Sequence, residues 1–272
     1  MKERGGSRGQ IALTGLGGGF FSGLTGVGGG AIMVPLMTGL LRMRQHAAHG
    51  TSLVIIIFAA AASALTYQLR DGVRWEIVAG LLPTSLLGAY LGARLVQHLP
   101  AMRLRQLFGA FVFIIGLRLL AFPGIDPVFE AEGVTAAGLG AAIGLSGGLV
   151  CGALGVGGGA VFVPALVLLM GLGQHEAQGV SLCVIVGAAV VGAWTHARHG
   201  SIDGAMARRI APLAVPAGMA GALAASLLGG RILQAVFATV LIIVGTQMFA
   251  TATRALRRQP VALPSAGAGA IV

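Results

Sequence analysis

The stretch Gly26-Val27-Gly28-Gly29-Gly30-Ala31 returns further along the chain as Gly155-Val156-Gly157-Gly158-Gly159-Ala160. The same offset keeps 15 of 28 positions identical between residues 26–53 and 155–182, without a gap. Apolar composition alone would not hold that register, so the sequence predicts two homologous halves. The expected segments are an N-terminal tail at 1–9, a first repeat at 10–122, a linker at 123–132, a second repeat at 133–252 and a C-terminal tail at 253–272.

The composition of both halves is that of a membrane protein. Of the 272 residues, 56% are hydrophobic and only 10% are charged, and the mean hydropathy is +0.90. A soluble domain carries about a quarter charged residues, so the soluble globular and disordered classes are excluded. The two cysteines, Cys151 and Cys183, lie in apolar sequence and predict no disulfide framework. The lipid bilayer is therefore an expected partner.

The net charge of +10 indicates topology rather than a polyanionic partner. The 18 basic residues lie mostly at the ends of apolar runs, where lysine and arginine mark cytoplasmic loops. They do not form the clustered basic face that nucleic-acid binding requires, so no nucleic acid is expected as a partner.

Each half contains the same parts. A glycine-interrupted apolar stretch comes first, at 10–41 and at 138–172. Three apolar runs follow, each near the ~20 residues of one membrane crossing. These runs lie near 47–68, 76–97 and 104–122, and near 176–197, 206–228 and 232–252. The fold class expected is an all-α polytopic membrane protein with two repeats, each a glycine-broken helix or re-entrant hairpin plus three transmembrane helices.

The orientation of the repeats depends on whether the glycine-broken stretch crosses the membrane or re-enters it. Crossing gives parallel repeats, and re-entry gives inverted repeats. With the N-terminus in the cytoplasm, the inverted arrangement places 14 of the 18 basic residues on the cytoplasmic side, and the parallel arrangement places 12 there. The excess of basic residues inside favours inverted repeats with both termini in the cytoplasm.

The glycine motifs at 23–30 and 152–159 suggest an anion site. Glycine permits positive φ and close approach of a ligand to the backbone. The helix that starts at each triple glycine directs free N–H groups and a positive dipole end at the bilayer centre, where two such ends would bind an anion. Alternatively, the glycines only let helices pack closely. The candidate substrate-binding residues are Gly26, Gly28, Gly29, Gly30, Gly155, Gly157, Gly158 and Gly159, with Ser52 and Ser181.

The duplicated Gly-x-x-Gly-Val-Gly-Gly-Gly followed by Val-Pro, together with Gln-His-x-Ala-x-Gly-x-Ser-Leu at 45–53 and 174–182, resembles the sulfite exporter TauE/SafE family of permeases. The resemblance covers nearly the whole chain apart from the tails. It implies transport of a small anion, sulfite or an organosulfonate, across a bacterial inner membrane. The rival interpretation is a structural or assembly subunit that does not transport.

Several further residues have two interpretations each. His46 and His175 could gate, bind the anion or carry a proton, or they could simply be helix-start residues at the membrane surface. Cys151 stands in the second glycine motif where Ser22 stands in the first, so its thiol could act near the site or be a small packing residue. Likewise, Ser52 and Ser181 could donate to an anion or to a neighbouring carbonyl.

Metal, cofactor and enzyme chemistry are not expected. The pairs His46/His49 and His196/His199 have i, i+3 spacing, but neither survives the repeat and no carboxylate or cysteine cluster accompanies them. No polar catalytic cluster is evident either. Because no acid lies deep in an apolar run, a carboxylate proton relay is not expected, and the simplest energetic interpretation is uniport driven by the membrane potential. The sequence leaves open the anion, the direction and the oligomeric state.

Overall fold

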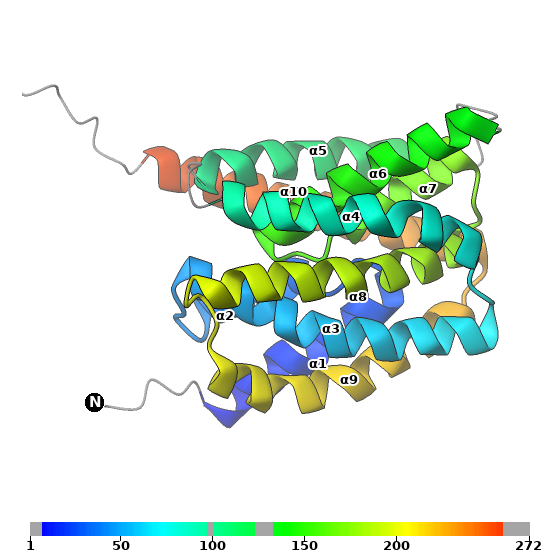
Figure 1. Cartoon of the computed structure of the whole chain (residues 1–272). Coiled ribbons are helices and arrows are strands. Elements are labelled where there is room, and N and C mark those ends of the chain that lie inside the picture. Colours follow the sequence, from blue (N-terminus) through cyan, green and yellow to red (C-terminus); the bar gives the residue numbers. More distant parts are fainter. Residues whose placement is uncertain (1–6, 97–100, 123–132, 258–272) are drawn as a thin grey trace, which may run out of the picture.

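The computed structural model describes residues 7–96, 101–122 and 133–257. Within these ranges the chain forms α-helices and no strand, which confirms the all-α expectation (Figure 1). The helices are α1 (Arg8–Thr25), α2 (Gly30–Gly39), α3 (Gln45–Arg70), α4 (Trp75–Leu95), α5 (Ala101–Ala121), α6 (Gly133–Leu154), α7 (Gly159–Met170), α8 (Gln174–Arg198), α9 (Gly204–Ser226) and α10 (Gly230–Arg257). The linker expected at 123–132 lies outside the described residues, and α10 continues past the expected boundary at 252.

Each glycine-broken stretch folds back on itself as a hairpin. A Cβ built on Gly18 of α1 would lie 2.2 Å from the Met33 Cγ of α2. A Cβ built on Gly147 of α6 would lie 2.2 Å from the Phe162 Cε1 of α7. Since α2 and α7 run back along the helices that precede them, each stretch forms a helical hairpin, as the re-entrant arrangement requires.

The unwound links are shorter than the sequence suggested. The glycine motif at 23–30 begins within α1, which stays helical to Thr25 and closes with the Gly26 N–H donating to the Ser22 carbonyl, 2.9 Å away. We name residues 26–29 tip 1 and the corresponding residues 155–158 tip 2.

The two sets of five helices run in opposite directions through the bundle. In Figure 1, α1 enters from the end where the N-terminus lies, and α6 enters from the other end, where α5 finishes. α3 and α8 likewise run antiparallel, and α10 returns to the end where α1 began. This is the geometry that the inverted arrangement requires, with the two hairpins entering from opposite ends.

Six of the described helices are long and apolar enough to cross a membrane, namely α3, α4, α5, α6, α8 and α10. Five of them match runs expected to cross. α9 matches the sixth run but is not among these helices, because it carries Arg208, Arg209 and the prolines 212 and 216. α6 is included because its 22 residues hold no charged side chain. Large apolar side chains on α5 and α10 face outward, such as Leu107 and Ile243.

Glycines bring the hairpins into backbone contact with neighbouring helices. On the α1–α9 side, a Cβ on Gly23 would lie 1.9 Å from the Gly218 carbonyl oxygen. On the α6–α4 side, a Cβ on Gly152 would lie 2.0 Å from the Ala89 carbonyl oxygen. Only glycine permits backbones to approach this closely in a membrane bundle. Each hairpin is thereby held against a helix of the other half, with its tip at the centre.

Candidate functional site

Both tips take their shape from glycines with positive φ. In tip 1, φ is 69° at Gly26, 93° at Gly28 and 76° at Gly29. Tip 2 repeats these values at the corresponding glycines, with 62° at Gly155, 106° at Gly157 and 79° at Gly158. A side chain at such positions is strained, so the triple-glycine motif is a backbone requirement in both halves.

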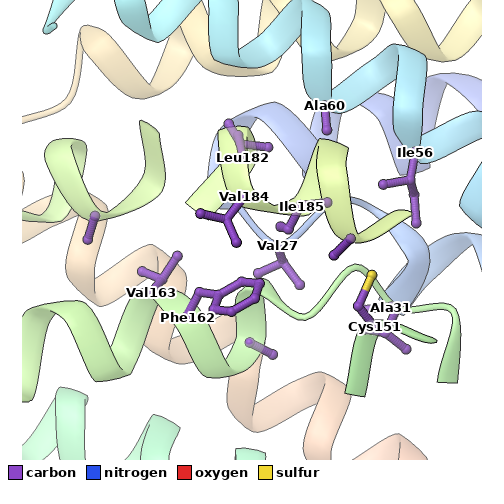
Figure 2. Packing of buried hydrophobic residues seen from close by; sticks show 14 of the residues in the cluster. Val27, Ala31, Ile56, Ala60, Cys151, Phe162, Val163, Leu182, Val184 and Ile185 are labelled. Atoms are coloured by element: carbon purple, nitrogen blue, oxygen red, sulfur yellow. The ribbon is translucent and has the colours of Figure 1, made fainter. Parts of the chain in front are cut away.

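The two tips touch each other through their backbones. A Cβ built on Gly28 would lie 3.1 Å from the Gly157 Cα, and one built on Gly157 would lie 2.4 Å from the Val27 carbonyl oxygen. Val27 is 1% exposed, and Figure 2 shows it at the centre of the buried apolar residues, near Ile185 and Phe162. The tips thus meet in the interior, and in this conformation they leave no room for even one added carbon between them.

The first residues of α2 and α7 each face the opposite tip. A Cβ on Gly30 would lie 2.2 Å from the Gly155 carbonyl oxygen, and one on Gly159 would lie 2.3 Å from the Gly26 carbonyl oxygen. The N–H groups at the start of a helix have no acceptor in a preceding turn and carry the positive end of the dipole. Two positive helix ends therefore come together at the centre of the bundle.

Two buried serines tie each tip to the other half. The Ser52 hydroxyl is 2.8 Å from both the Gly155 and the His49 carbonyl oxygens, and the Ser181 hydroxyl donates to the Gly26 carbonyl over 2.8 Å. In this conformation both hydroxyl protons are given to backbone carbonyls. Either serine would therefore bind an anion only after releasing its carbonyl.

Polar side chains of α3 and α8 flank the tips as two matched clusters. Beside tip 1, the Tyr67 hydroxyl lies 3.1 Å from the Gly23 carbonyl oxygen and also bonds the Gln178 side-chain oxygen. Beside tip 2, His196 Nε2 lies 3.0 Å from the Gly152 carbonyl oxygen, and a Cβ on Gly155 would lie 2.8 Å from the His49 Cα.

Members of the two clusters correspond through the offset that relates the two glycine motifs. His196 corresponds to Tyr67, and Gln178 corresponds to His49. Gln178 Nε2 and His49 Nδ1 are buried without a hydrogen-bond partner, as is the Ser22 hydroxyl. Buried polar atoms normally have a partner, so these atoms are candidates to bind water or substrate.

The profile of the family described as "Sulfite exporter TauE/SafE" matches residues 2–119 and 140–272. The chain belongs to this family. This confirms the resemblance stated above and makes the protein a multi-pass membrane transporter, so the non-transporting alternative is set aside.

Two relatives match the TauE/SafE transporter over most of their length. The probable membrane transporter protein YunE of Bacillus subtilis (strain 168) is 27% identical over 267 residues, which cover 88% of this chain and 96% of YunE. A probable membrane transporter protein of Xylella fastidiosa (strain 9a5c) is 28% identical over 241 residues, covering 86% of this chain and 92% of the relative. No solved structure matches the chain.

The transporter's two repeat-related histidines do not come together. His46 is exposed in the first turn of α3, and His175 is half-buried in the first turn of α8, where its Nε2 lies 3.1 Å from the Ala225 carbonyl oxygen. Since α3 and α8 begin at opposite ends of the bundle, the two histidines are far from each other and sit at helix starts (Figure 1). A gating or proton-carrying role for them stays a prediction.

Cys151 lies beside tip 2 in the transporter's main apolar cluster. Its side chain is fully buried, and its sulfur is within hydrogen-bonding reach of the Gly157 backbone (Figure 2). This position is close to the candidate site, while the surroundings are those of a packing residue. A chemical role for the thiol stays a prediction.

Sequence reasoning missed the flanking polar clusters. His49 and His196 were weighed only as members of metal pairs within one helix, whereas the structure pairs each of them with tip 2 across helices. A usable signal was present, because His49 and Gln178 are polar, repeat-related and precede Ser52 and Ser181 by one helical turn. Because His49 and Gln178 are different residue types, comparing the two halves by identity did not show that both positions are polar.

Replacing Ser181 by alanine should destabilise the transporter by about 1–3 kcal/mol, since the buried Gly26 carbonyl would lose its side-chain donor. Ser63→Ala is the matched control, because Ser63 is equally buried but bonds the Ala59 carbonyl within its own helix. Thermal unfolding of the purified variants in detergent measures the difference. Equal stability of the two variants would show that the Ser181 tie does not hold tip 1.

Proposed function

We propose that the protein is a permease that exports a small oxyanion, sulfite or an organosulfonate, and that the anion binds between tip 1 and tip 2. The observation that carries the proposal is the contact of the two tips at the bundle centre, with the starts of α2 and α7 facing each other's tips. Helix starts bind anions through free N–H groups and the dipole. Paired broken helices at the midplane are the usual substrate site of transporters built from inverted repeats.

The surroundings of the tips supply neutral donors rather than negative charge. Gln178 Nε2 and His49 Nδ1 are unpartnered there, and no Asp or Glu is buried among the described residues. A carboxylate beside the tips would repel an anion and disfavour its binding by several kcal/mol. Amide, imidazole and backbone N–H donors instead give an oxyanion short, charge-assisted hydrogen bonds.

The two tips are in contact in this conformation, so transport requires them to separate. An oxyanion needs the tips to part, which breaks the Ser52 and Ser181 bonds and frees two hydroxyl donors for the substrate. The two hairpins enter from opposite ends, so separation toward one end or the other would open the site to one side at a time. We propose this rocking of the halves around the tips as the alternating-access step.

The membrane and its orientation complete the proposal. We place the protein in the bacterial inner membrane with both termini in the cytoplasm, on the strength of the basic-residue distribution. Both helical termini lie at the same end of the bundle, which such a topology requires (Figure 1).

Ligand-induced thermal stabilisation of the purified protein tests the substrate class. Sulfite and methanesulfonate should each raise the melting temperature, because ligand at 100 times its Kd stabilises the native state by about 2.7 kcal/mol. Chloride tests selectivity for an oxyanion, and neutral dimethyl sulfone is the control for shape without charge. Stabilisation by none of the oxyanions, or equally by chloride and dimethyl sulfone, would contradict a site for sulfur oxyanions.

A further inference from the structure

A small cavity beside the tips has a mostly apolar lining, which includes Leu154 and Met248, and also contains groups that suit an anion. Gly30 and Ala31 at the start of α2, His49 of α3, Arg105 of α5 and Val156 of tip 2 all line it. Its volume of about 10 Å³ is the room of a single water molecule in this closed conformation. His49 and Arg105 each lie one turn inside helices that begin at the end of the bundle where α1 starts (Figure 1). The cavity therefore lies between that end and the tips.

His49 presents a buried ring nitrogen without a hydrogen-bond partner to this cavity. The residue is 3% exposed, and its Nδ1 has no hydrogen-bond partner. A polar nitrogen that is buried without a partner destabilises the folded protein, and a ligand that bonds to this nitrogen would remove the destabilisation. The His49 backbone packs against tip 2, since a Cβ built on Gly155 would lie 2.8 Å from the His49 Cα.

Arg105 brings a positive charge to the same cavity. Its guanidinium is always protonated and carries five donors, so it favours an oxyanion as a bidentate partner. Among residues 7–96, 101–122 and 133–257, the one ion pair is Arg74–Glu76 on the surface, so no described carboxylate neutralises Arg105. The start of α2 adds the N–H groups of Gly30 and Ala31.

The charge has no counterpart in the other half. The repeat offset places Gln234 where Arg105 stands, and Gln178 where His49 stands. Gln234 Nε2 lies 3.4 Å from the Leu119 carbonyl oxygen, so this amide is directed at α5. The position that carries a cation in one half therefore carries a neutral amide in the other, so the two approaches to the centre differ in charge at this position.

We propose that Arg105, His49 and the first turn of α2 form an anion-binding subsite on the side of the tips where the chain termini lie, and that it makes anion capture asymmetric. The proposal rests on the proposed permease function. Because the cavity has room for only one water molecule in the closed conformation, the subsite takes a small oxyanion once it widens. On the opposite side, Gln178 and Gln234 stand at the positions that correspond to His49 and Arg105.

Sulfite flux through Arg105→Gln, measured in right-side-out and inside-out membrane vesicles, tests the subsite. A protease-cleavable C-terminal tag reports which vesicles expose the terminus side. The KM for sulfite presented from that side should rise about 10- to 100-fold, as expected for loss of hydrogen bonds to a charged group. The KM from the opposite side should change less than threefold. Arg103→Gln is the matched control, because Arg103 is exposed on the same helix and loses the same charge.

An unchanged KM from the terminus side, or an equal rise from both sides, would overturn the subsite while leaving the permease function in place. Absence of sulfite and methanesulfonate flux through the wild-type protein would instead defeat the permease function. If Arg105→Gln does not fold, Arg105→Lys compared with Arg103→Lys gives the same comparison. Lysine keeps the charge but loses the bidentate geometry, so a smaller rise confined to the terminus side is expected.

Discussion

Replacing Gly157 by alanine should reduce anion transport at least tenfold while leaving a folded membrane protein. The added Cβ would lie 2.4 Å from the Val27 carbonyl oxygen, at a residue whose φ is 106°. Backbone strain of this kind costs about 1–3 kcal/mol, and the clash with tip 1 adds to it. Since about 1.4 kcal/mol corresponds to a factor of ten, we expect at least a tenfold loss of flux in reconstituted vesicles.

Gly200→Ala separates the effect of the tip contact from the effect of backbone strain. Gly200 also has a positive φ, 65°, but a Cβ there would meet nothing within 4 Å. This variant should carry sulfite at a rate near that of the wild-type protein. Wild-type flux through Gly157→Ala, or an equal loss in both variants, would show that close contact between the tips is not needed for transport. Gel filtration and thermal unfolding verify that both variants fold.

The membrane potential should drive a monovalent anion through the protein without a pH gradient. A potential of 100 mV is worth about 2.3 kcal/mol per charge, which corresponds to roughly a fiftyfold concentration ratio at equilibrium. Proteoliposomes with a valinomycin-clamped potassium gradient, positive inside, should therefore accumulate sulfite. No Asp or Glu is buried among the described residues to couple a proton by way of a carboxylate.

Flux that ignored the imposed potential but followed a pH gradient would contradict uniport. The buried histidines His49 and His196 would then be the first residues to test as proton carriers, because they lie close to each other beside tip 2. The double variant His49→Gln, His196→Tyr places there the residues that flank tip 1. Under uniport, potential-driven flux should survive in this variant, whereas a proton-coupled carrier should lose its response to pH.

Much of the fold could be predicted because the duplicated glycine motif sets the alignment of the two repeats and the place where the helix breaks in each. Gly28 and Gly157 stand at positive φ, and a tight break beginning at such residues is visible in the sequence alone. The three apolar runs in each half matched helices within a few residues. α9 also matches its run, although Pro212 and Pro216 lie inside it, and it packs against α1 and α3.

The cross-connections of the site could not be predicted, because they depend on which helices meet. Ser52 reaches Gly155 across 103 residues, and Tyr67 reaches Gln178 across 111. Local sequence pattern carries no information on the packing of α3 against tip 2 and against α8, which creates these two contacts. Arg105 was interpreted as a topology signal near a helix start, yet the inward face of α5 directs it to a cavity beside the tips. Arg105 lies one helical turn inside the start of α5, and the sequence alone does not show that this depth brings its side chain to the cavity.

The most direct test of the central claim is an anomalous difference map of crystals soaked with selenite, a heavier oxyanion of the same shape as sulfite. A selenium peak is expected at the bundle centre, within hydrogen-bonding reach of the first N–H groups of α2 or α7. Sulfite in the soak should remove this peak. A selenite peak elsewhere on the protein that sulfite displaces, with none at the tips, would contradict the account.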